Sequence, residues 1–200
     1  MRPKIIIIDG HSGAGKSTFA EYLGEYLNCP VIHGDEFLFD SVHVHKEDMK
    51  RIFGDYPKDN ETGLEYLVRC DNTETIQSTK ELFTAIREYV QSRFEQAIEY
   101  NNKSKFLVLE WLTACDLNRL WLSADFRIMI DSPQNKRAGF LNENNYKIGK
   151  AVHDIQSIRQ QAHSSSLKQA KNIDTNIHND YNEHLKNHAK NISATLLYKI

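Results

Sequence analysis

The sequence predicts an α/β protein in which a parallel sheet lies between two layers of helices. Short apolar runs typical of buried strands occur at residues 5–8, 31–33, 106–109 and 126–130 of the 200-residue chain. Stretches with apolar side chains at helical spacing separate these runs. Strands that alternate with helices form βαβ units with parallel strands and helices on both faces. We therefore expect a three-layer α/β/α sandwich with a mostly five-stranded parallel sheet.

The first two elements are the clearest. Ile5 to Ile8 form a continuous β-branched run, which is typical of a strand that is buried on both faces. A helix is expected to begin at Ser17 and to end near Asn28, because apolar side chains follow one face of that segment. A buried strand that leads through a glycine-rich turn into a helix is the expected opening of the fold.

The later elements follow the same reasoning with weaker signals. Apolar residues recur every four positions from Leu82 to Ile98, which predicts a long amphipathic helix. A fifth strand is expected within 171–177 and a helix within 181–196. Residues 40–75 contain glycine, proline and many charges without a clean period. We interpret them as a loop-rich insertion on the acceptor side of a single domain that spans residues 1–200.

Composition excludes several classes of protein. The net charge is −2, so the chain lacks the basic field that attracts nucleic acid. Its three cysteines, Cys29, Cys70 and Cys115, have neither disulfide-framework nor zinc-site spacing. The apolar run at 5–8 is too short for a signal peptide or a membrane span. We expect a cytoplasmic protein that binds neither membrane nor nucleic acid; the sequence does not indicate its oligomeric state.

The motif G-x-x-x-x-G-K-[ST] is present between the first strand and the first helix. In such a loop, glycines let successive N–H groups face phosphate oxygens, and the helix N-terminus favours negative charge. Lys16 would reach the β- and γ-phosphates, and the Ser17 hydroxyl would bind Mg²⁺. We therefore predict that the chain binds ATP and Mg²⁺. The predicted nucleotide-binding residues are Gly10, His11, Ser12, Gly13, Ala14, Gly15, Lys16, Ser17 and Thr18.

Acidic residues follow several predicted strands, at the sheet edge where α/β proteins bind ligands. Asp35 comes 18 residues after Ser17 and could accept the proton of an acceptor hydroxyl; the alternative is a turn-capping role. Glu110 could bind Mg²⁺ or the acceptor, or be a solvated strand-end acid. Asp131, before Ser132-Pro133, is interpreted as a helix cap, and Asp9 is assigned no chemistry.

On these residues the chain resembles the uridine kinase and nicotinamide riboside kinase group. The phosphate loop is one shared feature. The segment His33 to Leu38 is similar to the group's x-x-D-x-F-Y, and Val108 to Glu110 resembles its I-x-E-G. The resemblance implies ATP-dependent phosphoryl transfer to a hydroxyl of a nucleoside-like small molecule. It also implies that Asp35 is the catalytic base and that Glu110 binds substrate or metal.

The chain departs from that group at three places. Trp111 replaces a glycine, Leu38 replaces an aromatic residue, and the lid helix has few arginines. Arg137 is the candidate lid cation, in a lid region of about residues 134–150; a solvated helix charge is the alternative. Three other functions stay open: a dephospho-coenzyme A kinase-like enzyme, a P-loop ATPase switch, and a regulatory protein that only binds nucleotide.

Overall fold

The computed structural model describes residues 2–39, 43, 46–61, 65–66, 69, 76–137, 170–181 and 184–198. It contains a five-stranded sheet in the order β2-β3-β1-β4-β5, and all neighbouring strands are parallel. The predicted fold class is therefore confirmed. The strands are β1 (Lys4–Gly10), β2 (Val31–His33), β3 (Phe106–Glu110), β4 (Phe126–Asp131) and β5 (Thr175–His178).

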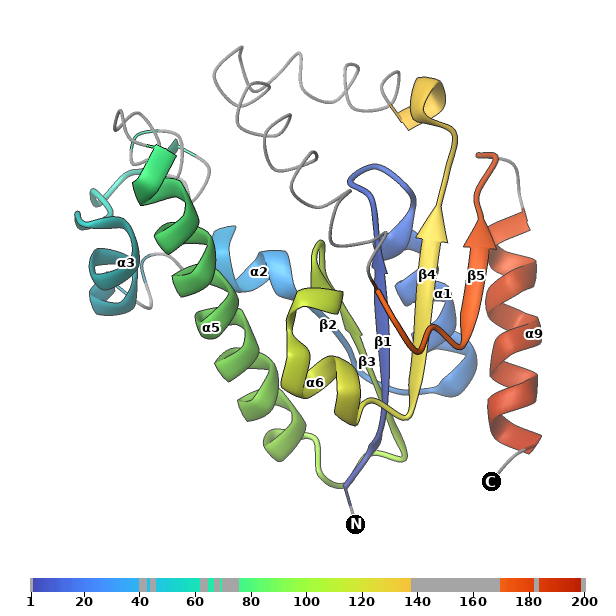
Figure 1. Ribbon diagram of the computed structural model, residues 1–200. Coiled ribbons are helices and arrows are strands. Elements are labelled where there is room, and N and C mark those ends of the chain that lie inside the picture. The colour runs from blue at the N-terminus through green and yellow to red at the C-terminus, as the bar shows by residue number, and fades with distance from the viewer. Residues whose placement is uncertain are drawn as a thin grey trace.

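Helices cover both faces of the sheet (Figure 1). One layer contains α1 (Lys16–Leu27) and α9 (His184–Tyr198), which pack on each other. On the opposite face lie α5 (Ile76–Tyr100) and the short α6 (Asn118–Ser123). The long helix thus begins six residues before the apolar repeat that predicts it. Among the residues that the structure describes, no helix is long and apolar enough to cross a bilayer.

The isoleucine run lies at the centre of the molecule because β1 is the middle strand of the sheet. Ile6 and Ile8 pack with the core on the α1 side, and Ile5 and Ile7 pack with the core on the α5 side. All four side chains are at most 2% exposed. Alternation along the strand therefore places apolar groups in both cores, which explains the uninterrupted run.

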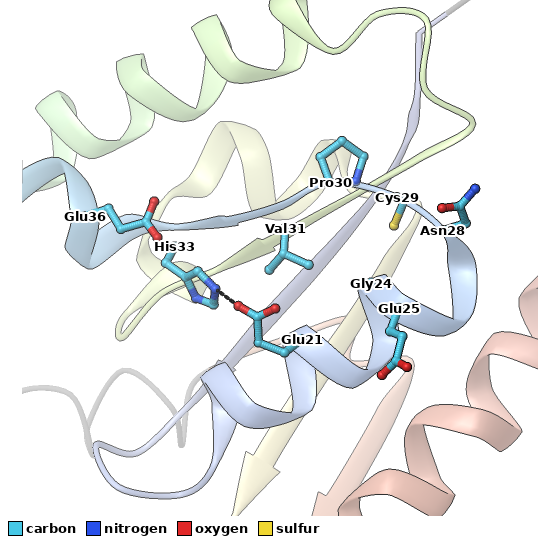
Figure 2. A pocket seen from close by; sticks show the side chains of 9 residues that line it. All are labelled: Glu21, Gly24, Glu25, Asn28, Cys29, Pro30, Val31, His33 and Glu36. Atoms are coloured by element: carbon cyan, nitrogen blue, oxygen red, sulfur yellow. Dashed lines mark hydrogen bonds and ion pairs between the residues drawn. The ribbon is translucent and has the colours of Figure 1, made fainter.

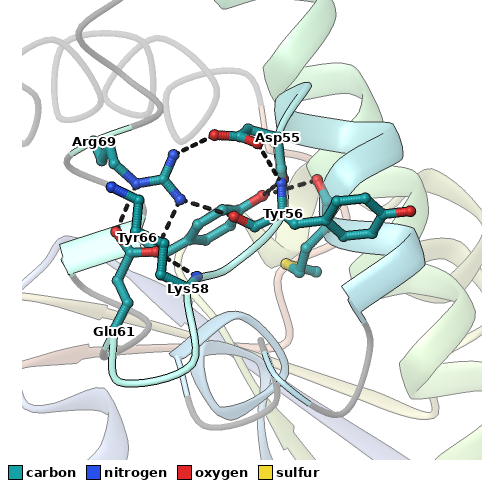
Figure 3. A network of polar contacts seen from close by, with 7 residues as sticks. Asp55, Tyr56, Lys58, Glu61, Tyr66 and Arg69 are labelled. Carbon is teal, nitrogen blue, oxygen red and sulfur yellow. Dashed lines mark hydrogen bonds and ion pairs between the residues drawn. The ribbon is translucent and has the colours of Figure 1, made fainter.

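The insertion after β2 is more regular than the sequence predicts. It begins with α2 (Gly34–Phe39), and the stretch interpreted as loop-rich contains the helix α3 (Lys46–Phe53), which packs on α5. Arg69 donates hydrogen bonds to Glu61 at 2.7 Å and to Asp55 at 2.5 Å, while the Tyr66 hydroxyl donates to the carbonyl oxygen of Asp55 at 2.8 Å (Figure 3). These contacts hold the turn after α3 in place. Residues 40–42, 44–45, 62–64, 67–68 and 70–75 lie outside the described residues.

Candidate functional site

The phosphate loop connects the end of β1 to the first turn of α1. Gly13 and Gly15 have φ angles of 74° and 90°, in the left-handed region that favours glycine. A Cβ on Gly15 would lie 2.7 Å from Asn179 Nδ2, so a side chain there would also meet the C-terminal part of the chain. The loop therefore winds tightly into α1, whose first N–H groups have no acceptor within the helix. This is the local geometry that a phosphate group requires.

Glu110 lies against this loop, because β3 is next to β1 in the sheet. Ser17 Oγ donates a hydrogen bond to Glu110 Oε2 at 3.2 Å, and Lys16 Nζ lies 3.6 Å from Glu110 Oε1. The side chains of Lys16 and Glu110 are 8% and 6% exposed. The structure thus brings together three of the residues that the sequence analysis selects for nucleotide and metal binding.

His33 completes this cluster from the end of β2. Its Nδ1 lies 2.9 Å from Glu110 Oε2, and its Nε2 lies 2.8 Å from Glu21 Oε1 on α1. Figure 2 shows the contact between His33 and Glu21. No local sequence pattern assigns His33 a role, because none indicates that two carboxylates from other elements flank it.

The charges of this cluster depend on one another. Burial acts to raise the pKa of Glu110, but the hydrogen bond with His33 and the charge of Lys16 outweigh it and hold that pKa below its usual range. The hydrogen bond with Glu110 raises the pKa of His33 to about 9, against the opposing effect of burial and with help from Glu21. At neutral pH the cluster therefore contains a carboxylate held between two cations, Lys16 and protonated His33.

The oxygen atoms of this cluster fit Mg²⁺. The Ser17 hydroxyl and the Glu110 carboxylate are hard donors on the same side of the phosphate loop. Within the described part of the chain, no group of three His, Cys, Asp or Glu side chains is arranged to hold a metal ion. The Ser17 hydroxyl and the Glu110 carboxylate suit Mg²⁺, which binds proteins through one or two side chains and takes its other ligands from water and phosphate.

Asp35 lies at the same edge of the sheet, in the first turn of α2. Its side chain is exposed, and its Oδ1 accepts a hydrogen bond from Trp111 Nε1 at 3.1 Å. Trp111 directly follows Glu110 and is only 5% exposed, and Trp121 is 3% exposed. Both tryptophans are therefore core residues rather than open stacking surfaces. Trp111, which replaces a glycine of the resembled kinases, thus contacts the predicted base directly.

Asp9 is an important residue that the sequence analysis missed. Its side chain is fully buried, and its carboxylate accepts hydrogen bonds from the backbone N–H groups of Gly10 at 2.6 Å, Thr113 at 3.2 Å and Cys115 at 2.7 Å. Asp9 thus joins the start of the phosphate loop to the turn after β3. An acidic residue that directly follows an isoleucine run inside a buried strand is the signal that could have identified it.

The segment after β5 also supports the loop, which the sequence analysis did not predict. Asn179, at 4% exposed, donates a hydrogen bond from Nδ2 to the carbonyl oxygen of Ala14 at 2.9 Å. The hydroxyl of Tyr181 donates to the carbonyl oxygen of Gly13. These contacts join residues 165 and 168 positions apart, so no local pattern indicates them.

The predicted lid region is described only as far as residue 137. Asp131 Oδ1 accepts a hydrogen bond from the N–H of Ser132 at 2.8 Å and lies 3.6 Å from Arg137 Nη1. Lys136 Nζ donates to the carbonyl oxygen of Asp180 at 2.7 Å. Among the residues that the structure describes, Arg137 pairs with Asp131 and not with the phosphate loop. A role for Arg137 over the transferred phosphoryl group stays a prediction, and residues 138–150 lie outside the described residues.

A groove of about 590 Å³ lies on the outer side of His33, between α1 and β2 (Figure 2). Its lining includes the carboxylates of Glu21, Glu25 and Glu36. None of the residues that line it belongs to the phosphate loop, so this groove is not the predicted nucleotide site.

Comparison with known proteins identifies the fold. No protein-family model and no curated protein matches the chain. Among solved structures, TT1252 from Thermus thermophilus has a TM-score of 0.68 at 18% identity, with 99% of this chain and 98% of that chain covered. Shikimate kinase from Bacteroides thetaiotaomicron has a TM-score of 0.55 at 14% identity, covering 97% and 98%. Dephospho-CoA kinase from Campylobacter jejuni has a TM-score of 0.54 at 12% identity, covering 98% and 97%.

These similarities cover 97–99% of the chain and show a fold that this protein shares with shikimate kinase and dephospho-CoA kinase. At such low identity they show the fold alone. None of the three is named as a nucleoside kinase, so the resemblance to the uridine kinase and nicotinamide riboside kinase group stays a prediction.

Proposed function

We propose that this protein is a small-molecule kinase that transfers the γ-phosphoryl group of ATP to a hydroxyl of a nucleoside-like acceptor. The observation that carries the proposal is the arrangement at one edge of the sheet. Lys16, Ser17 and Glu110 form a contacting cluster at the phosphate loop, and Asp35 follows the neighbouring strand β2 at the same edge. Residues that bind the phosphoryl donor and residues that bind the acceptor can bring the two substrates together when they lie at one edge of the sheet.

On the donor side, the loop N–H groups and Lys16 would hold the β- and γ-phosphates. Mg²⁺, bound through the Ser17 hydroxyl and Glu110, would neutralise the charge that develops on the phosphate oxygens. His33 would keep Glu110 in position from the other side of its carboxylate, through the contact of 2.9 Å. Arg137 would bring a further positive charge to the lid.

On the acceptor side, the hydroxyl oxygen attacks the γ-phosphorus as the bond from that phosphorus to the bridging oxygen of ADP breaks. The Asp35 carboxylate accepts the hydroxyl proton. The products are the phosphorylated acceptor, ADP and the proton on Asp35, which passes to solvent and restores the carboxylate, so atoms and charge balance without any further reactant.

The choice of acceptor rests on the resemblance and on the solved neighbours. The resembled group suggests a nucleoside-like compound. The shared fold also occurs in shikimate kinase, in dephospho-CoA kinase and in the APS kinase CysC of Mycobacterium tuberculosis, the last with a TM-score of 0.52 at 13% identity and with 98% of each chain covered. A dephospho-CoA kinase-like activity therefore remains the second candidate.

The test measures ADP release from MgATP over a panel of acceptors. The panel contains uridine, cytidine, nicotinamide riboside, deoxynucleosides, pantothenate, dephospho-CoA, shikimate and APS. We expect one compound to stimulate ADP release.

Asp35→Asn should keep ATP binding but lose about 10²- to 10⁴-fold in turnover, because a positioned general base contributes that much. Lys16→Ala should abolish transfer, and Glu36→Gln, an exposed neighbour of Asp35 on α2, is the matched control.

Two results would contradict the proposal. Turnover of ATP that no compound changes would indicate an ATPase switch rather than a kinase, since a kinase excludes water until its acceptor arrives. Full activity of Asp35→Asn with a stimulating compound would show that the base is another residue.

A further inference from the structure

Two consecutive residues, Glu110 at the end of β3 and Trp111 directly after it, contact the two halves of the proposed site. Glu110 packs on the α1 side of the sheet, where it contacts Ser17 and Lys16. Trp111 belongs to the core on the α5 side, where it contacts Asp35. Trp111 directly follows β3, and its N–H donates to the carbonyl oxygen of Ile8 on β1, so the alternation of side chains along the strand continues to this residue.

The position of Trp111 is held on several sides. Its backbone N–H donates to the carbonyl oxygen of Ile8 at 3.3 Å, which ties it to the end of β1 directly before the phosphate loop. Its indole ring lies against Gly34, the first residue of α2: a Cβ on Gly34 would be 2.6 Å from Trp111 Cγ and Cδ1. Trp111 is only 5% exposed, so surrounding side chains restrict the rotation of its ring.

The indole ring of Trp111 contacts Asp35 through Nε1, its one polar atom. Trp111 Nε1 donates to Asp35 Oδ1 at 3.1 Å. Indole can only donate a hydrogen bond, and an ionised carboxylate can only accept, so the pair matches the charged form that a general base needs. The absence of a Cβ on Gly34 is what lets the ring come close enough to α2.

We propose that Trp111 is a positioning residue for phosphoryl transfer, which holds the carboxylate of Asp35 in a fixed orientation relative to the phosphate loop. The inference rests on the proposed function of Asp35. The hydrogen bond from a buried ring, itself tied to β1, restricts the rotation of the Asp35 carboxylate before the acceptor binds, and preorganisation of this kind lowers the barrier.

The chain offers a matched control for this inference. It contains two tryptophans, and both are buried and each donates one indole hydrogen bond. Trp121 Nε1 donates to the carbonyl oxygen of Lys171 at 2.9 Å. Trp111→Phe and Trp121→Phe therefore remove the same N–H group from comparable surroundings, but only the first change affects Asp35.

The first measurement is steady-state kinetics with MgATP and the most stimulating compound of the panel. We expect Trp111→Phe to lower kcat by about ten- to a hundredfold with KM for ATP unchanged, which is the effect of a misplaced reacting group. Trp121→Phe should stay within about twofold of wild type. If the role of Trp111 were merely structural, both variants would lose similar amounts of kcat. Urea unfolding checks that each variant is folded.

The second measurement does not depend on activity. In Trp121→Phe protein, Trp111 is the one fluorescent indole, and its emission responds to the carboxylate that it contacts. Asp35→Asn should change that emission, whereas Asp59→Asn, whose side chain is 92% exposed, should not. The same Asp35→Asn comparison in a chain that retains both tryptophans covers the case in which Trp121→Phe does not fold.

The outcomes separate this inference from the proposed function. Normal kcat of Trp111→Phe, together with loss of activity in Asp35→Asn, overturns the role of Trp111 and leaves the kinase proposal intact. Unchanged emission in Asp35→Asn overturns the contact itself. If no compound stimulates ADP release, the proposed function fails. The positioning role of Trp111 then fails as well, even if the change in emission shows that Trp111 contacts Asp35.

Discussion

His33 illustrates how the charge of one residue depends on elements that are distant in sequence. It lies between Glu110, 77 positions away, and Glu21 on α1. The hydrogen bond with Glu110 raises the pKa of His33 from 6.5 to about 9, so the ring is protonated at neutral pH. A proton on His33 therefore stabilises the fold as well as the orientation of Glu110.

His33→Gln tests this charge through its effect on stability at two pH values. The pKa of His33 is higher in the folded chain, so its contribution is fully present below pH 6.5 and is lost as pH rises through 9. Allowing for solvent near Glu21, we expect the variant to lower the free energy of unfolding by about 1 kcal/mol at pH 6 and by much less at pH 9.5. Urea unfolding measures both.

The exposed His188 on α9 provides the control for this experiment, since His188→Gln should have a small effect at either pH. An equal loss for His33→Gln at pH 6 and at pH 9.5 would contradict a protonated His33.

At the scale of elements, the site depends on how three strand ends are tied together. The ends of β1, β2 and β3 lie side by side because the sheet order is β2-β3-β1-β4-β5. Asp9 at the end of β1 then accepts hydrogen bonds from the turn that contains Thr113 and Cys115, and Glu110 at the end of β3 reaches Ser17. The phosphate loop therefore has the turn after β3 as a rigid neighbour.

Asp9→Asn should loosen this connection. An amide has one acceptor oxygen and carries no charge, so it cannot replace a buried carboxylate that accepts three backbone hydrogen bonds. We expect the free energy of unfolding to fall by about 2–3 kcal/mol, measured by urea unfolding. Asp59→Asn makes the same change at an exposed side chain and should cost little. Equal stabilities of the two variants would show that the buried carboxylate is not needed.

At the scale of the whole molecule, the segment after β5 contacts the phosphate loop, which lies close to the start of the sequence. Asn179 follows β5 and bonds to Ala14, and α9 packs on α1 directly behind the loop. Gly15 would contact both Asn179 and Leu185 if it had a side chain. The C-terminal part of the chain is therefore a support for the N-terminal motif.

Asn179→Ala tests this long-range support. The change removes the donor to the carbonyl oxygen of Ala14 and the acceptor for the N–H of Tyr181. Since both groups lie in buried or part-buried surroundings, we expect a loss of about 2 kcal/mol in the free energy of unfolding and a rise in KM for ATP. Urea unfolding and ADP release measure the two effects. Asn187→Ala, at an exposed position of α9, should change neither.

Much of this protein is determined by the sequence itself. The isoleucine run, the phosphate-loop motif and the helix predicted from Ser17 all come from local patterns of the sequence. Local patterns specify local structure, because the period of apolar residues and the placement of glycines decide backbone conformation. The sequence therefore determined the fold class, the location of the phosphate-loop motif and the strand-end positions of Asp35 and Glu110.

The tertiary structure decided what those residues contact. Sheet order places Glu110 on the loop and His33 beside it, and it directs Trp111 to Asp35, 76 positions away. The hydrogen-bond partners of Asp9 and Asn179 lie 104 and 165 positions away, so only the folded chain shows what these two residues hold together. The physical reason is that a side chain's charge and orientation depend on which elements pack around it. No pattern along one segment contains that information, because several segments must fold together to create it.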